Sequence, residues 1–154
     1  MDISSFFCNL TSVNQRVMLP SQGTIQFSEH SVLYDMLIPK DHLLRKINDL
    51  IDFNFVYKEL KAKYCPDNGR IAEDPVRMFK YLLLKTIYTL SDVDVVEHSR
   101  YDLSYKYFLG MMPEDDVINP SSLCKFRRIR LKDLDLLDML INKTVCLAIE
   151  KGLI

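Results

Sequence analysis

The sequence predicts an all-α fold: a compact domain of several helices with a helix-turn-helix-like arrangement, preceded by a loosely structured N-terminal arm. Two observations lead to this prediction. From about residue 41 onward, apolar residues recur every three or four positions, which is the spacing of one face of an α-helix. The segments with this spacing begin at capping residues and end at glycine or at turn sequences. We therefore expect an arm over residues 1–37 and one helical domain over residues 38–154.

The composition is compatible with one sizeable core and excludes several classes of protein. The chain has 154 residues, is 48% hydrophobic and has a net charge of −1, so any nucleic-acid surface must be local rather than global. Its cysteines and histidines are too scattered for a zinc finger, so we expect reduced thiols and neither a metal nor a cofactor. No secretion signal and no membrane-spanning apolar run is evident, which predicts a cytoplasmic protein without a membrane partner.

The N-terminal arm alternates short apolar and polar groups, and Pro20 and Gly23 interrupt it. We expect it to be irregular, or weakly stranded through Thr24–Phe27. The first helix of the domain is predicted over Asp41–Ile51, where the apolar residues follow the i, i+3, i+4 rule. A second, shorter helix is predicted over Phe55–Tyr64. Turn chemistry follows it in the sequence Cys65-Pro66-Asp67-Asn68-Gly69-Arg70.

The segment Pro75–Leu90 is predicted to be the longest apolar helix. Asp74 at the N-cap and Pro75 at the first helical position are a strong start signal. Apolar residues occupy most of its circumference, so we expect this helix to lie at the centre of the core.

The next helix is predicted to begin at Ser91 and to run to Arg100. Ser91 is the expected cap, with Asp94 at the capping-box position. The short junction with the preceding helix favours a helix-turn-helix arrangement. Asp92, Asp94 and Glu97 are also possible as metal ligands, but acids in the first turn are expected from the helix dipole.

Two further helices are predicted on either side of a basic segment. One covers Tyr101–Gly110, with Gly110 as its stop, and an acidic loop over residues 111–119 follows it. The last helix begins at Asp133 and ends at Gly152. Its apolar face is predicted to consist of Leu134, Leu137, Ile141, Val145 and Ala148.

The basic segment Ser121–Lys132 contains five basic side chains and no acid. Pro120 followed by Ser121 signals a helix start, with the serine hydroxyl as the expected cap. Leu123, Phe126 and Ile129 recur every third residue and are expected to form its buried stripe.

The side chains on the rest of this helix are candidates for binding the DNA backbone. Lys125 and Arg128 are expected on the far side from Phe126. Arg127 and Arg130 are expected to flank the buried stripe, held by Asp133, Asp135 or Asp102. The candidate DNA-binding residues are Ser121, Ser122, Lys125, Arg127, Arg128, Arg130 and Lys132. The alternative is a solvated basic face that pairs with neighbouring acids.

A succession of short motifs links the central helix to the basic one. In chain order they are Gly69-Arg70, Asp74-Pro75, Leu82-Leu83-Leu84-Lys85, Tyr88-Thr89-Leu90-Ser91-Asp92, Arg100-Tyr101-Asp102-Leu103, Tyr107-Phe108-Leu109-Gly110 and Asn119-Pro120-Ser121-Ser122-Leu123-Cys124-Lys125-Phe126-Arg127. With these motifs the chain resembles, from about Phe27 to its end, the InsH-like N-terminal domain of bacterial insertion-sequence transposases. That domain precedes a DDE catalytic domain. Ser122, where family members often have threonine, is a mild departure.

The resemblance implies binding of double-stranded DNA at the terminal inverted repeats of a transposon. It also implies that an RNase-H-like catalytic domain, with the first catalytic aspartate, would follow Ile154, so this chain is expected not to be an enzyme as given. Mg²⁺ is then expected only for that catalytic domain. The chain is expected to be a truncated remnant or one part of a split frame, and a homodimer or an association with a full-length transposase is the implied assembly.

Two other functions remain open from the sequence. One is a stand-alone helix-turn-helix transcriptional regulator. The other is a helical protein-interaction module in which residues 121–132 only pair with acids. Phosphate contacts would make DNA binding weaken steeply with salt, whereas an interaction module would not bind DNA.

Overall fold

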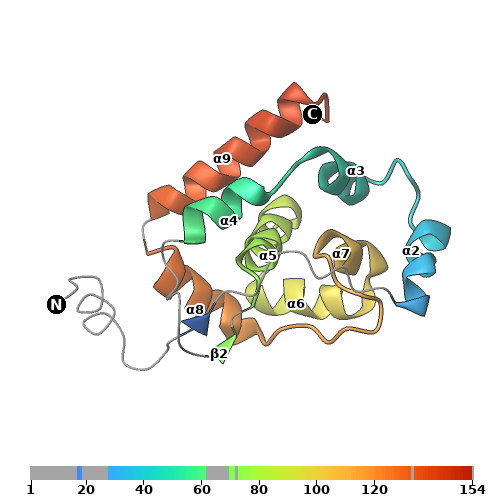
Figure 1. Ribbon diagram of the computed structural model, residues 1–154, viewed down its shortest axis with the longest axis horizontal. Helices are drawn as coiled ribbons and strands as arrows, with labels where there is room; N and C mark the ends of the chain where they lie inside the picture. The colour runs from blue at the N-terminus through green and yellow to red at the C-terminus, as the bar shows by residue number, and fades with distance from the viewer. Residues whose placement is uncertain (1–16, 19–27, 62–69, 72, 133, 154) are drawn as a thin grey trace.

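The computed structural model describes residues 17–18, 28–61, 70–71, 73–132 and 134–153. These residues form an all-α domain, as the sequence predicts (Figure 1). The elements in chain order are β1 (Val17–Met18), a 3₁₀ turn η1 (Glu29–Ser31), α2 (Val32–Leu37), α3 (Leu43–Leu50), α4 (Asn54–Lys61), β2 (Arg70–Ile71), α5 (Pro75–Tyr88), α6 (Asp92–Tyr101), α7 (Leu103–Phe108), α8 (Pro120–Arg130) and α9 (Leu134–Glu150). No helix in this described part is long and apolar enough to cross a membrane.

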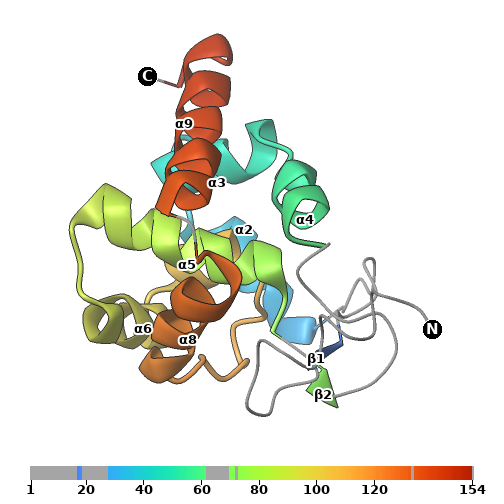
Figure 2. The same ribbon diagram turned by 90° about the vertical axis from the view of Figure 1, so that its left-hand side faces the viewer.

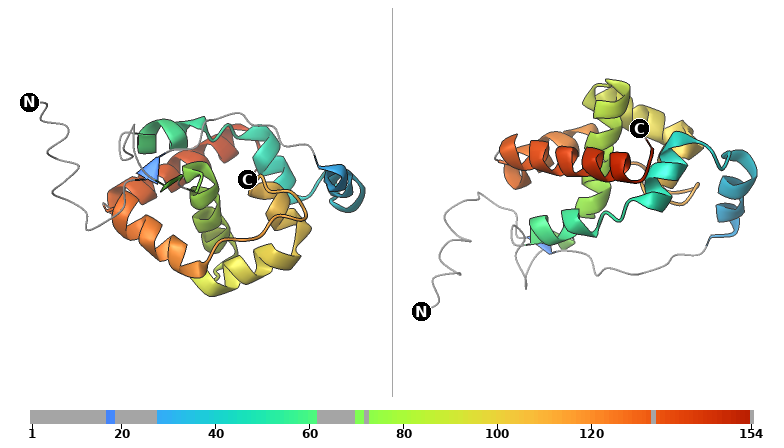
Figure 3. Two further views of the ribbon diagram at one scale, coloured as in Figure 1. Left: turned by 60° about the horizontal axis from the view of Figure 1, so that its bottom comes forward. Right: turned by 90° about the horizontal axis from the view of Figure 1, so that it is seen from above.

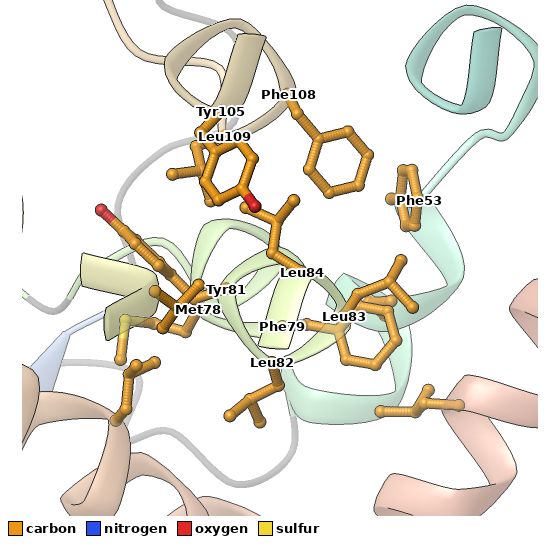
Figure 4. Close-up of a cluster of buried hydrophobic side chains, with 14 of the residues drawn as sticks. Phe53, Met78, Phe79, Tyr81, Leu82, Leu83, Leu84, Tyr105, Phe108 and Leu109 are labelled. Atoms are coloured by element: carbon orange, nitrogen blue, oxygen red, sulfur yellow. The ribbon is translucent and has the colours of Figure 1, made fainter. Parts of the chain in front are cut away.

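Helix α5 is the centre of the core, which confirms the prediction for this segment. Helices α4 and α9 lie on one side of it and α6 and α8 on the other (Figures 1 and 2). Its side chains point outward in several directions toward these neighbours, with Phe79, Tyr81 and Leu84 fully buried (Figure 4). Because the helix is surrounded, nearly every position along its middle contributes apolar burial to stability.

The ends of α5 follow local rules that the sequence shows. The Asp74 carboxylate accepts a hydrogen bond from the Val76 N–H at 2.9 Å, and Pro75 occupies the first turn. At the other end Thr89 adopts a left-handed conformation with φ 54° and stops the helix. Ser91 then starts α6 with the expected capping box to Asp94. The junction between the two helices is therefore short, as predicted, while its role in DNA binding stays a prediction.

The end of the N-terminal arm departs from the sequence prediction. Residues 29–37 are helical and packed, whereas an irregular arm was expected. The cause is a tertiary contact: the buried Tyr34 hydroxyl donates to the Met111 carbonyl at 2.7 Å, and its ring meets the Tyr107 ring edge-on at 5.4 Å. The strand predicted at Thr24–Phe27 and most of the turn at residues 65–70 lie outside the described residues.

A two-residue parallel strand pair was not predicted. Val17 is paired with Arg70 and Met18 with Ile71, so the described piece of the arm is joined to the segment before α5. Only two residues of each strand are paired, which is too short to produce a recognisable strand pattern in the sequence.

The buried face of α9 matches the predicted one in part, because Ala148 is buried and Leu137 and Ile141 are half-buried against the core, but it is rotated toward Leu140 and Thr144. Leu140, Thr144 and Ala148 are buried, whereas Val145 is exposed. Thr144 is accommodated because its hydroxyl donates to the Leu140 carbonyl at 2.9 Å. The sequence prediction chose the buried face of α9 from apolar residues only, so it left out Thr144.

Two lysines are buried in different parts of the fold. The Lys106 ammonium donates to the carbonyls of Pro113 at 2.6 Å and Asp115 at 2.7 Å, and so holds the acidic loop over residues 111–119. The Lys80 ammonium on α5 donates to the Asn48 side-chain oxygen at 2.5 Å and lies over the rings of Phe53 and Phe108. Burial lowers the pKa of Lys80 to about 8.

Candidate nucleic-acid interface

Helix α8 begins two residues earlier than the predicted cap at Ser121 implies. Asn119 is the N-cap, because its side-chain oxygen accepts from the Ser121 N–H at 2.9 Å, and Pro120 is the first helical residue. Ser121 lies inside the first turn, so the prediction that its hydroxyl caps the helix is wrong. Proline has no N–H to contribute and a fixed φ suited to the first turn, so the cap falls on the residue before it.

The inner side of α8 packs against α5 and α6. Leu123 and Phe126 are buried, as predicted, while Ile129 is only half-buried. Leu131, just after the helix, is buried instead and completes the apolar side. This packing fixes how α8 is rotated and therefore which cations face solvent.

The outer side of α8 carries Ser121, Cys124, Lys125 and Arg128, all exposed, and Lys132 is exposed just beyond the helix. Figure 3 (left) shows α8 at the edge of the molecule, beside α6. Within the described residues, no carboxylate lies within ion-pair distance of Lys125 or Arg128. The facing predicted for these two cations is therefore found, and the alternative that they pair with neighbouring acids is not supported by the geometry.

Arg127 has a different role, because it is tied to the body of the domain. Its guanidinium makes two hydrogen bonds to Asp92 at the start of α6, at 2.8 and 2.5 Å. Lys85 on α5 donates to the same carboxylate at 2.7 Å. These hydrogen bonds, that from Arg127 first, lower the pKa of Asp92 to about 2. One carboxylate thus links three helices.

The predicted partners of Arg127 were wrong. Asp133, Asp135 and Asp102 were expected because they are near in the sequence or in the predicted turns, whereas Asp92 is separated from Arg127 by 35 positions. An aspartate in the first turn of a helix is explained by the helix dipole without any partner on another helix, so Asp92 does not stand out in the sequence. The sequence contains no signal that would have shown this contact.

The remaining predicted site residues are less exposed. Ser122 and Arg130 are half-buried. The N–H of Ser122 donates to the Asn119 carbonyl at 2.8 Å, so the first turn of α8 satisfies its own donors. Of the seven predicted residues, Ser121, Lys125, Arg128 and Lys132 form the surface, which we call the outer face of α8.

The three acids considered as metal ligands have other partners. Asp92 binds two cations, Asp94 belongs to the capping box, and Glu97 lies 3.5 Å from Arg100. In the described part of the chain no group of three or more histidine, cysteine or acidic side chains is placed to hold a metal ion.

Two surface hollows lie away from α8. One, of about 450 Å³, is lined by residues of the α3–α4 connection together with Asp74 and Lys80. The other, of about 800 Å³, lies between the end of α2 and the α6–α7 junction. Neither is lined by a residue of the outer face of α8.

Comparison with protein families shows which family the chain matches. A family model described as "Transposase domain (DUF772)" matches residues 32–128, which is more than half of the chain. Comparison with curated proteins and with solved structures gave no significant match. The matched region begins at α2 and ends within α8, so it contains the packed core around α5 and most of the candidate interface.

Proposed function

Because the chain belongs to the family described as Transposase domain (DUF772), we propose that α8 binds double-stranded DNA at the terminal inverted repeats of a transposon. The single observation that carries this proposal is the outer face of α8, where Lys125 and Arg128 point to solvent with no carboxylate nearby among the described residues. Unpaired cations beside an exposed hydroxyl are suited to the negative phosphates of a DNA backbone.

The residues of α8 divide into two roles under this proposal. Lys125 and Arg128, with Lys132 beyond the helix, contact phosphate, and Ser121 adds a hydroxyl. Arg127 positions the helix through Asp92 and does not contact DNA. Rigid attachment of α8 keeps the cations in place before DNA arrives, so little conformational entropy is lost on binding.

The proposal assigns no chemistry to this chain. Among the described residues, the acids at the start of α6 are engaged in structural contacts, Asp92 with Arg127 and Asp94 in the capping box. In this assignment the chain recognises transposon ends, and strand cleavage with Mg²⁺ is carried out by a catalytic domain. The chain would act as a homodimer or in association with a full-length transposase.

The test measures binding of fluorescent duplexes by the wild type and by the Lys125→Ala, Arg128→Ala and Arg127→Ala variants over a range of salt concentrations. Lys46→Ala is the matched control, since Lys46 is an exposed lysine on α3 and not on α8. Each lost phosphate contact should reduce the slope of log K against log salt by about 0.9. Selection from a random duplex pool then gives the preferred sequence, for comparison with repeats that flank the gene.

We expect Lys125→Ala and Arg128→Ala to weaken binding while circular dichroism stays unchanged, and Lys46→Ala to bind like the wild type. Equal losses in all variants, including Lys46→Ala, would show general charge attraction and contradict the assignment to α8. If the wild type binds no duplex at low salt, the proposed DNA binding is wrong and the protein-interaction module is the better description. A selected sequence unrelated to any flanking repeat would favour the transcriptional regulator.

A further inference from the structure

Helix α9 has an exposed stripe on the side away from the core, with large apolar residues at its two ends. Its inner side is buried through Leu140, Thr144 and Ala148. On the opposite side Met139 is 44% and Ile149 57% exposed, and Asn142 and Cys146 are exposed between them. Figure 3 (right) shows α9 running along the outside of the molecule, over α5. This outer stripe of Met139, Asn142, Cys146 and Ile149 is solvent-exposed in the described chain.

The spacing of the outer stripe is that of a helix-pairing seam. Its members are separated by three, four and three positions, which is the alternation of a and d sites in a heptad repeat. In that assignment Met139 and Cys146 are a residues, and Asn142 and Ile149 are d residues. A helix that only faced water would not need large apolar side chains at this spacing.

The charges that flank the outer stripe favour one orientation. Asp138 and Lys143 are exposed on its two sides, at the g and e positions of the heptad. In a parallel pair, each Asp138 lies beside the partner's Lys143, so two opposite-charge pairs form. In the antiparallel alignment that stacks all four stripe residues, Lys143 instead lies beside the partner's Lys143, which is repulsive. The Lys143 ammonium lies 4.8 Å from the centre of the Phe55 ring of its own chain.

We propose that α9 pairs in parallel with α9 of a second copy of this chain. Met139, Cys146 and Ile149 each meet the same residue of the partner, and the two Asn142 amides bond to each other across the seam. Because the outer stripe lies opposite the buried face, the two domain bodies sit on opposite sides of the pair. This inference uses no property of α8 and does not depend on DNA binding.

The pairing surface is short, and its length sets the expected strength. From Met139 to Ile149 the stripe covers ten helical steps, or about 15 Å at about 1.5 Å per residue. That is smaller than the contact surface of a stable standard-sized interface. The pair is therefore expected to form reversibly, with a dimer fraction that rises with protein concentration.

The first test uses Cys146 as a reporter of parallel pairing. Two full-length variants are compared in a glutathione buffer: one keeps only Cys146, and the matched control keeps only Cys124, which is also exposed. Glutathione disulfide oxidises two thiols to one protein disulfide and is reduced to two glutathione molecules. We expect the Cys146 variant to form covalent dimers with increasing concentration and the Cys124 variant to stay largely monomeric. Equal cross-linking of both variants, or none in either, would overturn the proposal.

The second test examines the flanking charges under reducing conditions by sedimentation equilibrium. Asp138→Lys alone should weaken self-association, and the charge-swapped double variant Asp138→Lys with Lys143→Asp should restore it. Circular dichroism verifies that each variant is folded. A wild type that stays monomeric at the highest soluble concentration, or an Asp138→Lys variant that associates as well as the wild type, would contradict the parallel pair. Loss of DNA binding with the dimer intact would refute only the function proposed for α8.

Discussion

At the scale of single residues, Asp92 does the most for the candidate interface. It lies in the first turn of α6 and accepts hydrogen bonds from Lys85 of α5 and Arg127 of α8. Because of this contact, the Arg127 guanidinium is not available to DNA, and Arg127 acts as a positioning residue. The rotation of α8, and hence the exposure of Lys125 and Arg128, is fixed in part by a carboxylate on another helix.

Replacement of Asp92 by asparagine should destabilise the domain at neutral pH. The folded-state pKa of about 2 lies below the ordinary value of 3.8, so the contribution is present above about pH 4 and is lost as the pH falls toward 2. With about 1.4 kcal/mol per pH unit, we expect a loss of about 2 kcal/mol in the free energy of unfolding at pH 7. Urea denaturation at pH 7 and at pH 3 measures it.

The difference between wild type and Asp92→Asn should be smaller at pH 3 than at pH 7. Asp116→Asn is the control, because Asp116 is an exposed acid in the loop before α8. An Asp92→Asn variant as stable as the wild type at pH 7 would show that water replaces the two cation contacts without loss.

Lys80 has the opposite effect on stability. Its ammonium is buried on α5, where it donates to the neutral side-chain oxygen of Asn48 and lies over two aromatic faces. The attraction of the Asp74 carboxylate raises its pKa, but by less than burial lowers it. Burial lowers its pKa from 10.5 to about 8, so the charged form is disfavoured in the folded chain. Between these two values the unfolded chain holds a proton that the folded chain has lost, and stability due to Lys80 rises with pH.

The variant Lys80→Met should therefore be more stable than the wild type at pH 7, by about 1–3 kcal/mol after the lost hydrogen bond and ring contacts are subtracted. The advantage should shrink as the pH rises from 8 toward 10. Denaturation of both proteins at pH 7, 8, 9 and 10 isolates Lys80, because the tyrosines titrate alike in both. A methionine variant that is less stable at every pH would mean that the Asn48 and ring contacts outweigh desolvation.

At the scale of the element, the start of α8 distinguishes two neighbouring polar residues. Asn119→Ala removes the acceptor for the Ser121 N–H and should cost about 1 kcal/mol of stability. Ser121→Ala, the matched control, changes an exposed hydroxyl inside the first turn and should change stability little. Thermal and urea denaturation of both variants measure this. If Ser121→Ala lost more stability than Asn119→Ala, Ser121 rather than Asn119 would be the residue that caps the helix.

The elements show what periodicity can and cannot predict. For α8, large apolar residues at regular spacing determined the buried side, and the facing of Lys125 and Arg128 followed from it. For α9, Thr144 is buried because its hydroxyl finds a backbone partner within the helix, so a face chosen by apolar character alone was rotated. The sequence showed which segments are helical better than it showed how each helix is turned.

At the scale of the whole molecule, the central place of α5 could be predicted, because a helix that is apolar around its circumference has to be surrounded. The packing of α2 could not be predicted. It depends on a hydrogen bond between Tyr34 and Met111, two residues that are 77 positions apart. Contacts of this kind, like that between Arg127 and Asp92, depend on the assembled fold and leave no local pattern in the chain.

The hydrogen bonds from Lys106 to the carbonyls of Pro113 and Asp115 have a mechanical consequence. The connection between α7 and α8 has no regular secondary structure, yet one buried ammonium holds two of its carbonyls. The connection is therefore stiff rather than flexible, so a displacement of α8 also displaces α7. On slow timescales these three segments should open and close as one cooperative unit, and their backbone amides should exchange with solvent together.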